Sequence, residues 1–210
     1  MTFIYLVRHG ETLWNVEGRI QGHGDSPLTD AGRAQAQQVA HALARMPLQA
    51  IYTSDLTRAA ETGDAIAAPH ALTPRRDPRL REVFFGVWEG LLLEQITEGW
   101  PREAAAWRTD SLHHRPPGGE TLEAVQARIA ASLTEIVVAF PEGAVAVVGH
   151  GGSLRAAVAA ALDTTPAVSR HLQFDNGSLT TLEYSRDRFM LRCLNDTCHL
   201  RELPHSTGAG

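Results

Sequence analysis

Residues 3–15 of the chain read FIYLVRHGETLWN, an apolar run that stops at an arginine, a histidine and a glycine. The apolar run at 3–7 predicts a buried strand, and Arg8 and His9 stand where that strand ends. In open α/β sheets the functional crevice lies beyond the carboxyl ends of the parallel strands. This stretch therefore predicts both a strand of the central sheet and the place of a functional site.

Strands and helices are predicted to alternate along the rest of the chain. Further strands are expected at 50–54, within 72–80, at 144–148, and near 178–184 and 188–194. Helical spacing of apolar residues predicts helices at 28–46 with Thr29 as N-cap, at about 56–68, at 122–140 and after Gly149. This alternation predicts a three-layer α/β/α sandwich with a mostly parallel central sheet.

The length fits one domain. A chain of 210 residues, 43% of them hydrophobic, predicts a single globular domain over 1–203. Short helical pieces with Trp100 and Trp107 run into HHRPPGG, a proline- and glycine-rich break, so about 90–118 is expected to be a flap over the site. The last residues, 204–210, are expected to be a flexible tail.

Composition excludes several classes of function. A net charge of −5 argues against nonspecific nucleic-acid binding and against adhesion to anionic membranes. The chain has no apolar run of membrane-spanning length and no secretory signal at its start, which predicts a cytoplasmic protein. All 19 basic residues are arginines, so P-loop and Schiff-base lysine chemistry are excluded. Cys193 and Cys198 are predicted to be ordinary thiols rather than, with His199, a metal site.

A second strand end repeats the pattern of the first. The strand at 144–148 runs into Gly149, His150, Gly151 and Gly152. If the two strands are neighbours, His9 and His150 face the same space, and the glycine after each histidine lets the backbone approach a ligand. One such histidine is more often structural, but the pair favours a functional site.

Two arginines and a glutamate complete a possible phosphoryl-transfer site. Arg8 adjoins His9, and Arg58 follows the strand at 50–54; guanidinium groups match phosphate oxygens, although either arginine alone would be read as a surface ion pair. A neutral imidazole at His9 can hold a phosphoryl group covalently. Glu82, which precedes Phe84, Phe85 and Trp88, is predicted to occupy an apolar setting that favours the protonated acid, with a salt bridge to Arg81 as the alternative.

Five ordered motifs carry a family resemblance. LVRHGETLWN, LTDAGRAQA, SDLTRAAET, LREVFFGVWEG and VVGHGG together resemble the histidine phosphatase superfamily, which has the phosphoglycerate mutase-like fold. The resemblance implies that His9 becomes the phosphohistidine, that Glu82 is the proton donor, and that neither a metal nor a cofactor is needed. It implies phosphate or substrate contacts for Arg8, Asn15, Gln21, Gly22, Arg58, His150 and Gly151.

The resemblance leaves two reactions open. Cofactor-dependent mutases resemble one another in having an arginine after the catalytic glutamate, where this chain has Val83. The pattern is more similar to the branch that includes broad-specificity phosphatases and α-ribazole phosphatase, so we expect a phosphomonoester hydrolase. Mutase activity stays open because the flap contains Arg102, Arg108 and Arg115.

A noncatalytic scaffold and a metallohydrolase fit the sequence less well. A noncatalytic phosphate-binding scaffold would have lost part of the catalytic set, which is complete here. A metallohydrolase would need a ligand set such as H-E-x-x-H, which the ten histidines do not form.

The flap is expected to select the substrate. Flap residues 91–93, Trp100, Trp107, His113 and His114 favour a phosphomonoester with some apolar surface, unless these residues only pack the flap onto the domain. The sequence does not determine the oligomeric state, and a homodimer stays open.

Overall fold

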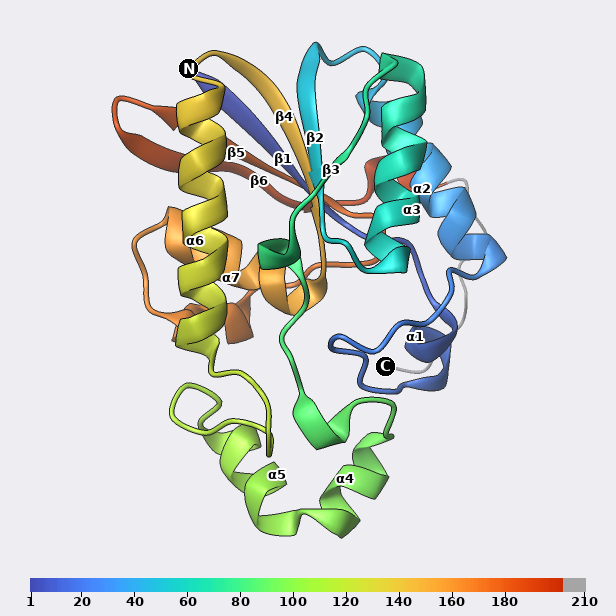
Figure 1. Ribbon diagram of the computed structural model, residues 1–210, viewed down its shortest axis with the longest axis vertical. Helices are drawn as coiled ribbons and strands as arrows, with labels where there is room; N and C mark the ends of the chain where they lie inside the picture. Colours follow the sequence, from blue (N-terminus) through green and yellow to red (C-terminus); the bar gives the residue numbers. More distant parts are fainter. Residues whose placement is uncertain (202–210) are drawn as a thin grey trace.

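A six-stranded sheet lies between two layers of helices in the computed structural model, which describes residues 1–201 (Figure 1). The strands, in chain order, are β1 (Thr2–Arg8), β2 (Leu48–Thr53), β3 (Arg75–Arg76), β4 (Gly143–Gly149), β5 (Leu179–Ser185) and β6 (Arg188–Asp196). Their order in the sheet is β3-β2-β4-β1-β5-β6. The first four are mutually parallel, whereas β5 runs antiparallel to β1 and to β6. The expected sandwich with a mostly parallel sheet is confirmed, and the expected tail at 204–210 lies outside the described residues.

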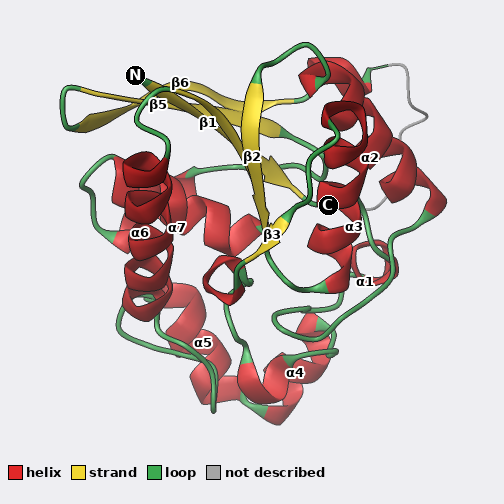
Figure 2. Cartoon of the chain, turned by 45° about the horizontal axis from the view of Figure 1, so that its top comes forward, coloured by secondary structure: helices red, strands yellow, loops and turns green. Residues whose placement is uncertain are grey.

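Alternate side chains of β4 build the two halves of the core. Val145 and Val147 pack with the apolar faces of α6 (Leu122–Ala139) and α7 (Gly151–Ala161). Ala146 and Val148 pack on the opposite face with α2 (Asp30–Leu43) and α3 (Thr57–Ala67). Successive side chains of a strand point to opposite faces, so a strand covered on both sides reads as the continuous apolar run seen in the sequence. Figure 2 shows the two helical layers on either side of the strands.

Capping residues place the ends of the helices near the predicted positions. The Thr29 side chain accepts a hydrogen bond from the Gly32 N–H at the start of α2, as expected of an N-cap. A short helix that the sequence did not predict, α1 (Leu13–Glu17), begins at Thr12 in a capping box with Asn15. Five residues are too few to show helical periodicity. The 3₁₀ turns span Ala68–His70, Pro78–Leu80, Gly86–Trp88, Pro166–His171 and Cys198–Leu200.

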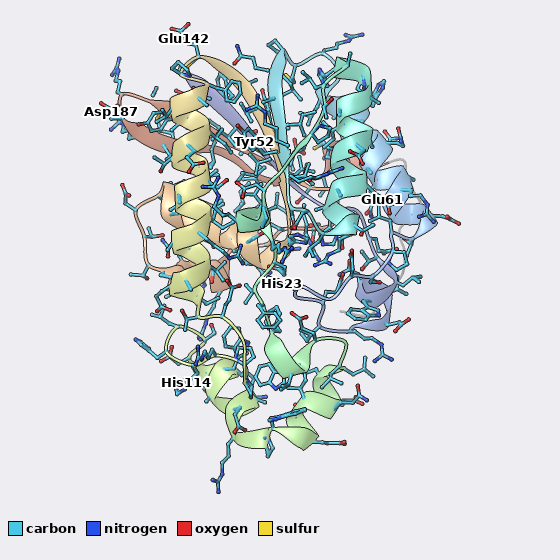
Figure 3. The ribbon with its side chains drawn as sticks, viewed as in Figure 1. His23, Tyr52, Glu61, His114, Glu142 and Asp187 are labelled. Carbon is cyan, nitrogen blue, oxygen red and sulfur yellow. The ribbon has the colours of Figure 1, made fainter. Side chains whose placement is uncertain are left out.

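Two further helices, α4 (Leu93–Gly99) and α5 (Pro101–Thr109), lie beyond the carboxyl ends of the parallel strands, at the bottom of Figure 1. Trp107 of α5 meets Phe85 and Trp88 edge-on, with ring centroids 6.0 Å and 6.4 Å away. Trp107 therefore packs the 90–118 region against the segment that carries Phe85 and Trp88. His113 and His114 are exposed, and Figure 3 places His114 on the outer side of this region. Within residues 1–201, no helix combines the length and apolarity that crossing a membrane requires.

Candidate active site

The pairing of β1 with β4 brings the two strand-end histidines together. The strands run parallel with Arg8 opposite Gly149, so His9 and His150 follow at the same level. The His9 N–H donates to the Gly149 carbonyl at 3.1 Å, and the two imidazole centroids lie 5.1 Å apart. His9 is 3% exposed and His150 is 0% exposed. The juxtaposition arises from strand register, because each histidine is the first residue beyond a buried strand.

The hydrogen bond of His9 fixes which ring nitrogen is free. Its Nδ1 lies 2.7 Å from the Gly10 carbonyl oxygen, and since a carbonyl can only accept, Nδ1 carries the proton. Nε2 then keeps its lone pair. Burial, together with the nearby charges of Arg58 and Arg8, holds the pKa of His9 well below its ordinary value. At neutral pH His9 is therefore an uncharged imidazole with a nucleophilic nitrogen available.

Arg58 is buried and Arg8 is partly buried beside this histidine, and main-chain carbonyls anchor both. Arg58, 1% exposed, donates from Nη1 to the Gly24 carbonyl at 2.8 Å and from Nη2 to the Gly22 carbonyl at 2.7 Å. Arg8 donates from Nη1 to the Phe174 carbonyl at 2.6 Å. Burial lowers the pKa of both guanidinium groups. These anchors orient each guanidinium, and Asp25 Oδ1 also lies 3.4 Å from Arg58 Nη1.

Several buried polar atoms in this cluster have no partner within the described chain. They are Nε of Arg8, Nε of Arg58 and both ring nitrogens of His150. Burial and the positive charge of Arg58 hold the pKa of His150 well below its usual value. The two arginine Nε–H groups and the one protonated nitrogen of neutral His150 are buried donors without acceptors, which is costly. An anion would satisfy these donors, with charge-assisted hydrogen bonds from the arginines. The cluster therefore has the chemistry of an anion-binding site.

Hydrogen bonds to the side-chain oxygen of Asn15 fix the orientation of its amide group. Its Oδ1 accepts hydrogen bonds from the Thr12 N–H at 3.1 Å and from Asn176 Nδ2 at 3.3 Å. The Nδ2 amide of Asn15 is thus left to donate toward the cavity that Asn15 lines. Asn176 also donates to the His9 carbonyl at 3.0 Å. Sequence reasoning missed Asn176, which lies far along the chain and has no local motif.

Glu82 is held by backbone N–H groups rather than surrounded by apolar side chains. Its Oε2 accepts from the Gly152 N–H at 3.0 Å, and its Oε1 accepts from the Ser153 N–H at 2.9 Å. The first N–H groups of a helix lack intrahelical partners, so the N-terminus of α7 attracts this carboxylate. The apolar setting expected from the sequence is not found. The alternative salt bridge is also wrong, because Arg81 instead pairs with Asp55 at 2.7 Å.

A cavity of about 160 Å³ joins these groups. Its lining contains most of the predicted site residues, namely Arg8, His9, Asn15, Gln21, Gly22, Arg58 and Glu82, together with Arg19, Ile20 and Phe85. His150 and Gly151 lie just outside this lining. His150 contacts His9, and a Cβ on Gly151 would lie 3.6 Å from Arg8 Nε. Arg19 was missed, although a basic residue two positions before Gln21 is a signal that could have found it.

A second cavity, of about 480 Å³, adjoins the first because Ile20 and Phe85 line both. Its walls are largely apolar and come mainly from the 90–118 region, with Ile96 and Trp107 among them, and Trp88 also lines it. Arg108 and Arg170 also line it.

Residue types that can bind metals form no suitable cluster in the part of the chain that the structure describes. Among residues 1–201, no group of three or more histidine, cysteine, aspartate or glutamate side chains is arranged to hold a metal ion. Cys193 and Cys198 are free thiols at exposed positions.

A family model described as the histidine phosphatase superfamily, branch 1, matches residues 4–197. The chain belongs to the histidine phosphatase superfamily. This membership confirms the family that the five motifs resembled, and it agrees with the sheet order and helical layers described above.

Individual members of the histidine phosphatase superfamily are similar over most of the chain. A protein named "Probable phosphoglycerate mutase GpmB" from Cronobacter sakazakii is 36% identical over 193 residues, covering 90% of this chain and 88% of its own length. The α-ribazole phosphatase of Shigella flexneri superposes with a TM-score of 0.87 at 28% identity, covering 92% of this chain and 96% of that one. A mycobacterial glucosyl-3-phosphoglycerate phosphatase has a TM-score of 0.85 at 35% identity, covering 92% and 98%. The predicted resemblance to phosphatases is confirmed, while the names of these relatives include a probable mutase as well as phosphatases.

Glu89 is another residue that sequence reasoning missed. Its carboxylate accepts hydrogen bonds from the N–H groups of His23 at 2.7 Å and Gly24 at 3.0 Å. The same loop supplies the two carbonyls that anchor Arg58, and Gly22 within it has a positive φ of 58°. Glu89 thereby ties the Arg58 anchor to the 85–89 segment. Its place in the quoted motif LREVFFGVWEG is the only sequence signal.

Proposed function

We propose that this histidine phosphatase superfamily member is a cytoplasmic, metal-independent phosphomonoester hydrolase that works through a covalent phosphohistidine on His9. One observation carries the proposal: a neutral imidazole with a free Nε2 lines a cavity beside buried cationic donors that have no partner. Phosphoryl transfer asks mainly for positioning and for stabilisation of negative charge. Both are available here from side chains alone.

The reaction has two steps. In the first, a phosphomonoester monoanion gives its proton to the Glu82 carboxylate, His9 Nε2 attacks phosphorus, the bond from phosphorus to the leaving oxygen breaks, and Glu82 passes the proton to the departing alcohol. In the second, Glu82 takes a proton from water, the water oxygen attacks the phosphohistidine, and the N–P bond breaks to regenerate neutral His9. Glu82 returns its proton to the departing phosphate.

Arg8, Arg58 and His150 stabilise the negative charge on the oxygens of the transferring phosphoryl group. Arg8 and Arg58 are preorganised by carbonyl anchors and keep Nε free. His150 has two unpartnered ring nitrogens, and an anion bound beside it favours its protonated, charged form. Donors that are already in place when charge develops need no reorganisation during the reaction. We assign Asn15, Gln21 and Gly22 to the same cavity as supporting phosphate contacts.

The wall of the larger cavity favours water over a second phosphate as the acceptor. A mutase must hold a phosphoglycerate in a second anion clamp. Here Val83 after Glu82 is buried, and Ile20, Phe85 and Trp107 line the adjoining cavity. We therefore propose leaving groups with apolar surface, held beneath α4 and α5. Mutase activity is the second candidate because Arg108 and Arg170 also line this cavity.

Hydrolysis of p-nitrophenyl phosphate in excess EDTA tests the proposal. The wild type should turn over, His9→Ala should be inactive, and Glu82→Ala should be slower across pH. Activity that requires added metal would contradict it. Assaying 2- and 3-phosphoglycerate for interconversion rather than phosphate release tests the mutase alternative.

A substrate panel tests the leaving-group site. Aryl phosphates should have a higher kcat/KM than glycerol phosphate, and Trp107→Ala should reduce that advantage. Equal kcat/KM values for both kinds of substrate would contradict the proposed preference.

A further inference from the structure

Arg128 of α6 uses its whole guanidinium to hold the chain around Glu82. Its Nη1 donates to the carbonyl oxygens of Arg79 at 2.6 Å and Arg81 at 2.7 Å, and its Nη2 donates to the Glu82 carbonyl at 2.8 Å. Nε and Nη2 also donate to the two oxygens of Glu120 at 3.0 Å and 2.9 Å. A guanidinium has five N–H donors, so all of them are used in a side chain only 17% exposed.

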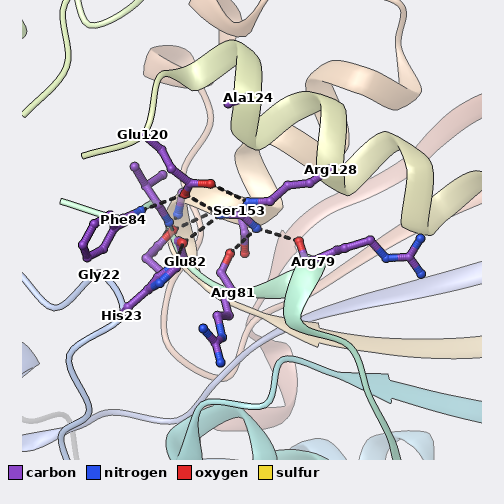
Figure 4. A network of polar contacts seen from close by, with 12 residues as sticks. Gly22, His23, Arg79, Arg81, Glu82, Phe84, Glu120, Ala124, Arg128 and Ser153 are labelled. Atoms are coloured by element: carbon purple, nitrogen blue, oxygen red, sulfur yellow. Dashed lines mark hydrogen bonds and ion pairs between the residues drawn. The ribbon is translucent and has the colours of Figure 1, made fainter. Parts of the chain in front are cut away.

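Glu120 links Arg128 to the backbone on the C-terminal side of Glu82. Its Oε2 accepts a hydrogen bond from the Phe84 N–H at 2.9 Å. Burial opposes ionisation of Glu120, but the hydrogen bonds from Arg128 and Phe84 hold its pKa below the ordinary value. Figure 4 shows the pair reaching the backbone on both sides of Glu82. The Arg128–Glu120 pair therefore fixes the main chain before and after this residue.

The segment that carries Glu82 needs such an anchor. Between β3 and α4 its only regular pieces, within the described chain, are the 3₁₀ turns Pro78–Leu80 and Gly86–Trp88. The Glu82 carboxylate lines the 160 Å³ cavity while it is bound to Gly152 and Ser153. A side chain can deliver a proton accurately only if its backbone stays fixed.

We infer that the Arg128–Glu120 pair is a positioning device for the proton donor, which it holds through the backbone of residues 79–84. The inference rests on the proposed role of Glu82. Neither residue lines the 160 Å³ cavity, and neither contacts His9, Arg8 or Arg58 through a hydrogen bond in the described chain. The pair should therefore affect protonation of the leaving group and leave the phosphate clamp intact.

Leaving-group dependence separates these two effects. An alkoxide such as that of glycerol needs a proton as it departs, whereas p-nitrophenolate leaves readily without one. Arg128→Lys keeps the charge but loses the planar fork that reaches five acceptors. We expect it to lower kcat/KM for glycerol 1-phosphate by about 10- to 100-fold, and kcat/KM for p-nitrophenyl phosphate by less than about threefold. The inhibition constant for orthovanadate should not change.

Matched variants guard against a general loss of structure. Glu120→Gln removes one of the two carboxylate acceptors and should reproduce the substrate-selective loss. Glu135→Gln is the control, because Glu135 lies on the same helix and pairs with the Arg79 side chain at 2.7 Å, yet it is 67% exposed and touches no carbonyl of the segment. It should leave both substrates unaffected.

The Glu82→Gln variant distinguishes failure of the proposed proton donor from failure of the proposed positioning role. If Glu82→Gln itself lowers kcat/KM, which reports the first step, equally for both substrates, the proposed proton donor is wrong. If it loses activity selectively while Arg128→Lys and Glu120→Gln do not, only the positioning role is overturned. An equal loss with both substrates in the Arg128 and Glu120 variants, with weaker vanadate inhibition, also overturns it. If Arg128→Lys does not fold, Glu120→Gln gives the same decision.

Discussion

Replacing Gly152 with alanine tests where the Glu82 carboxylate lies. A Cβ on Gly152 would lie within 3.0 Å of Glu82 Oε1 and 2.8 Å from Val83 Cγ2, closer than real Cβ atoms approach other heavy atoms. Both obstacles are side chains, so the helix can stay in place while the carboxylate moves. The expected result is a folded enzyme whose proton donor no longer binds the N-terminus of α7.

Two opposing contributions set the change in stability of Gly152→Ala, and the displacement of the carboxylate sets the change in kcat/KM. Losing hydrogen bonds to a charged group costs about 1.5–3 kcal/mol each, while alanine gains about 1 kcal/mol over glycine within a helix. Two lost hydrogen bonds, less the gain from alanine, give an expected net destabilisation of about 2–5 kcal/mol. A displacement of about 1 Å can reduce a rate roughly 100-fold. We therefore expect about a 100-fold lower kcat/KM for glycerol 1-phosphate, and less than about a 10-fold loss for p-nitrophenyl phosphate.

Steady-state kinetics with both substrates and a thermal melt measure this prediction. Gly99→Ala is the matched control, because a Cβ there meets nothing within 4 Å. If Gly152→Ala folds normally and hydrolyses glycerol 1-phosphate as fast as the wild type, the carboxylate does not act from this position and the reasoning is refuted.

Three further outcomes follow from the buried cationic cluster. Phosphate at 100 times its Kd should stabilise the fold by about 2.7 kcal/mol, which raises the melting temperature by roughly 5–10 °C; an unchanged melt would argue against an anion site. The lowered pKa values of His9 and His150 mean that the unfolded chain binds more protons below about pH 6.5. In phosphate-free urea titrations, stability should therefore fall as pH drops below that value, and His150→Asn should show a shallower fall; an equal slope in the variant would contradict this. Arg58→Lys should lower kcat/KM about 10- to 100-fold with every substrate and weaken vanadate inhibition, whereas a loss confined to poor leaving groups would contradict its place in the clamp.

Local sequence patterns are enough to predict the strands that carry the site and the layers of the fold. Apolar runs of strand length ending in Arg8-His9 and Gly149-His150 predicted β1 and β4, and strand pairing then placed both histidines at one edge. The alternation of strand and helix was enough for the layers of the sandwich. These features depend on residues that are close in sequence or on general rules of parallel sheets.

Other parts depend on contacts that no local pattern encodes. The sequence suggested an apolar setting for Glu82 from its neighbours Phe84 and Phe85, but tertiary packing brings the N-terminus of α7 to the carboxylate. Arg128 acts on main-chain carbonyls 46–49 positions away, and carbonyls leave no signature in residue type. β3 spans two residues, too short for any alternation to be read.

Trapping the phosphorylated enzyme would show whether His9 carries the phosphoryl group. The enzyme should be mixed with p-nitrophenyl phosphate, quenched in alkali, where phosphohistidine is stable, within the first turnover, and digested for mass spectrometry. We expect one phosphoryl group on His9 in the wild type and none in His9→Ala. Release of p-nitrophenol in the first turnover with His9 unmodified, or with the phosphoryl group on another residue, would contradict it.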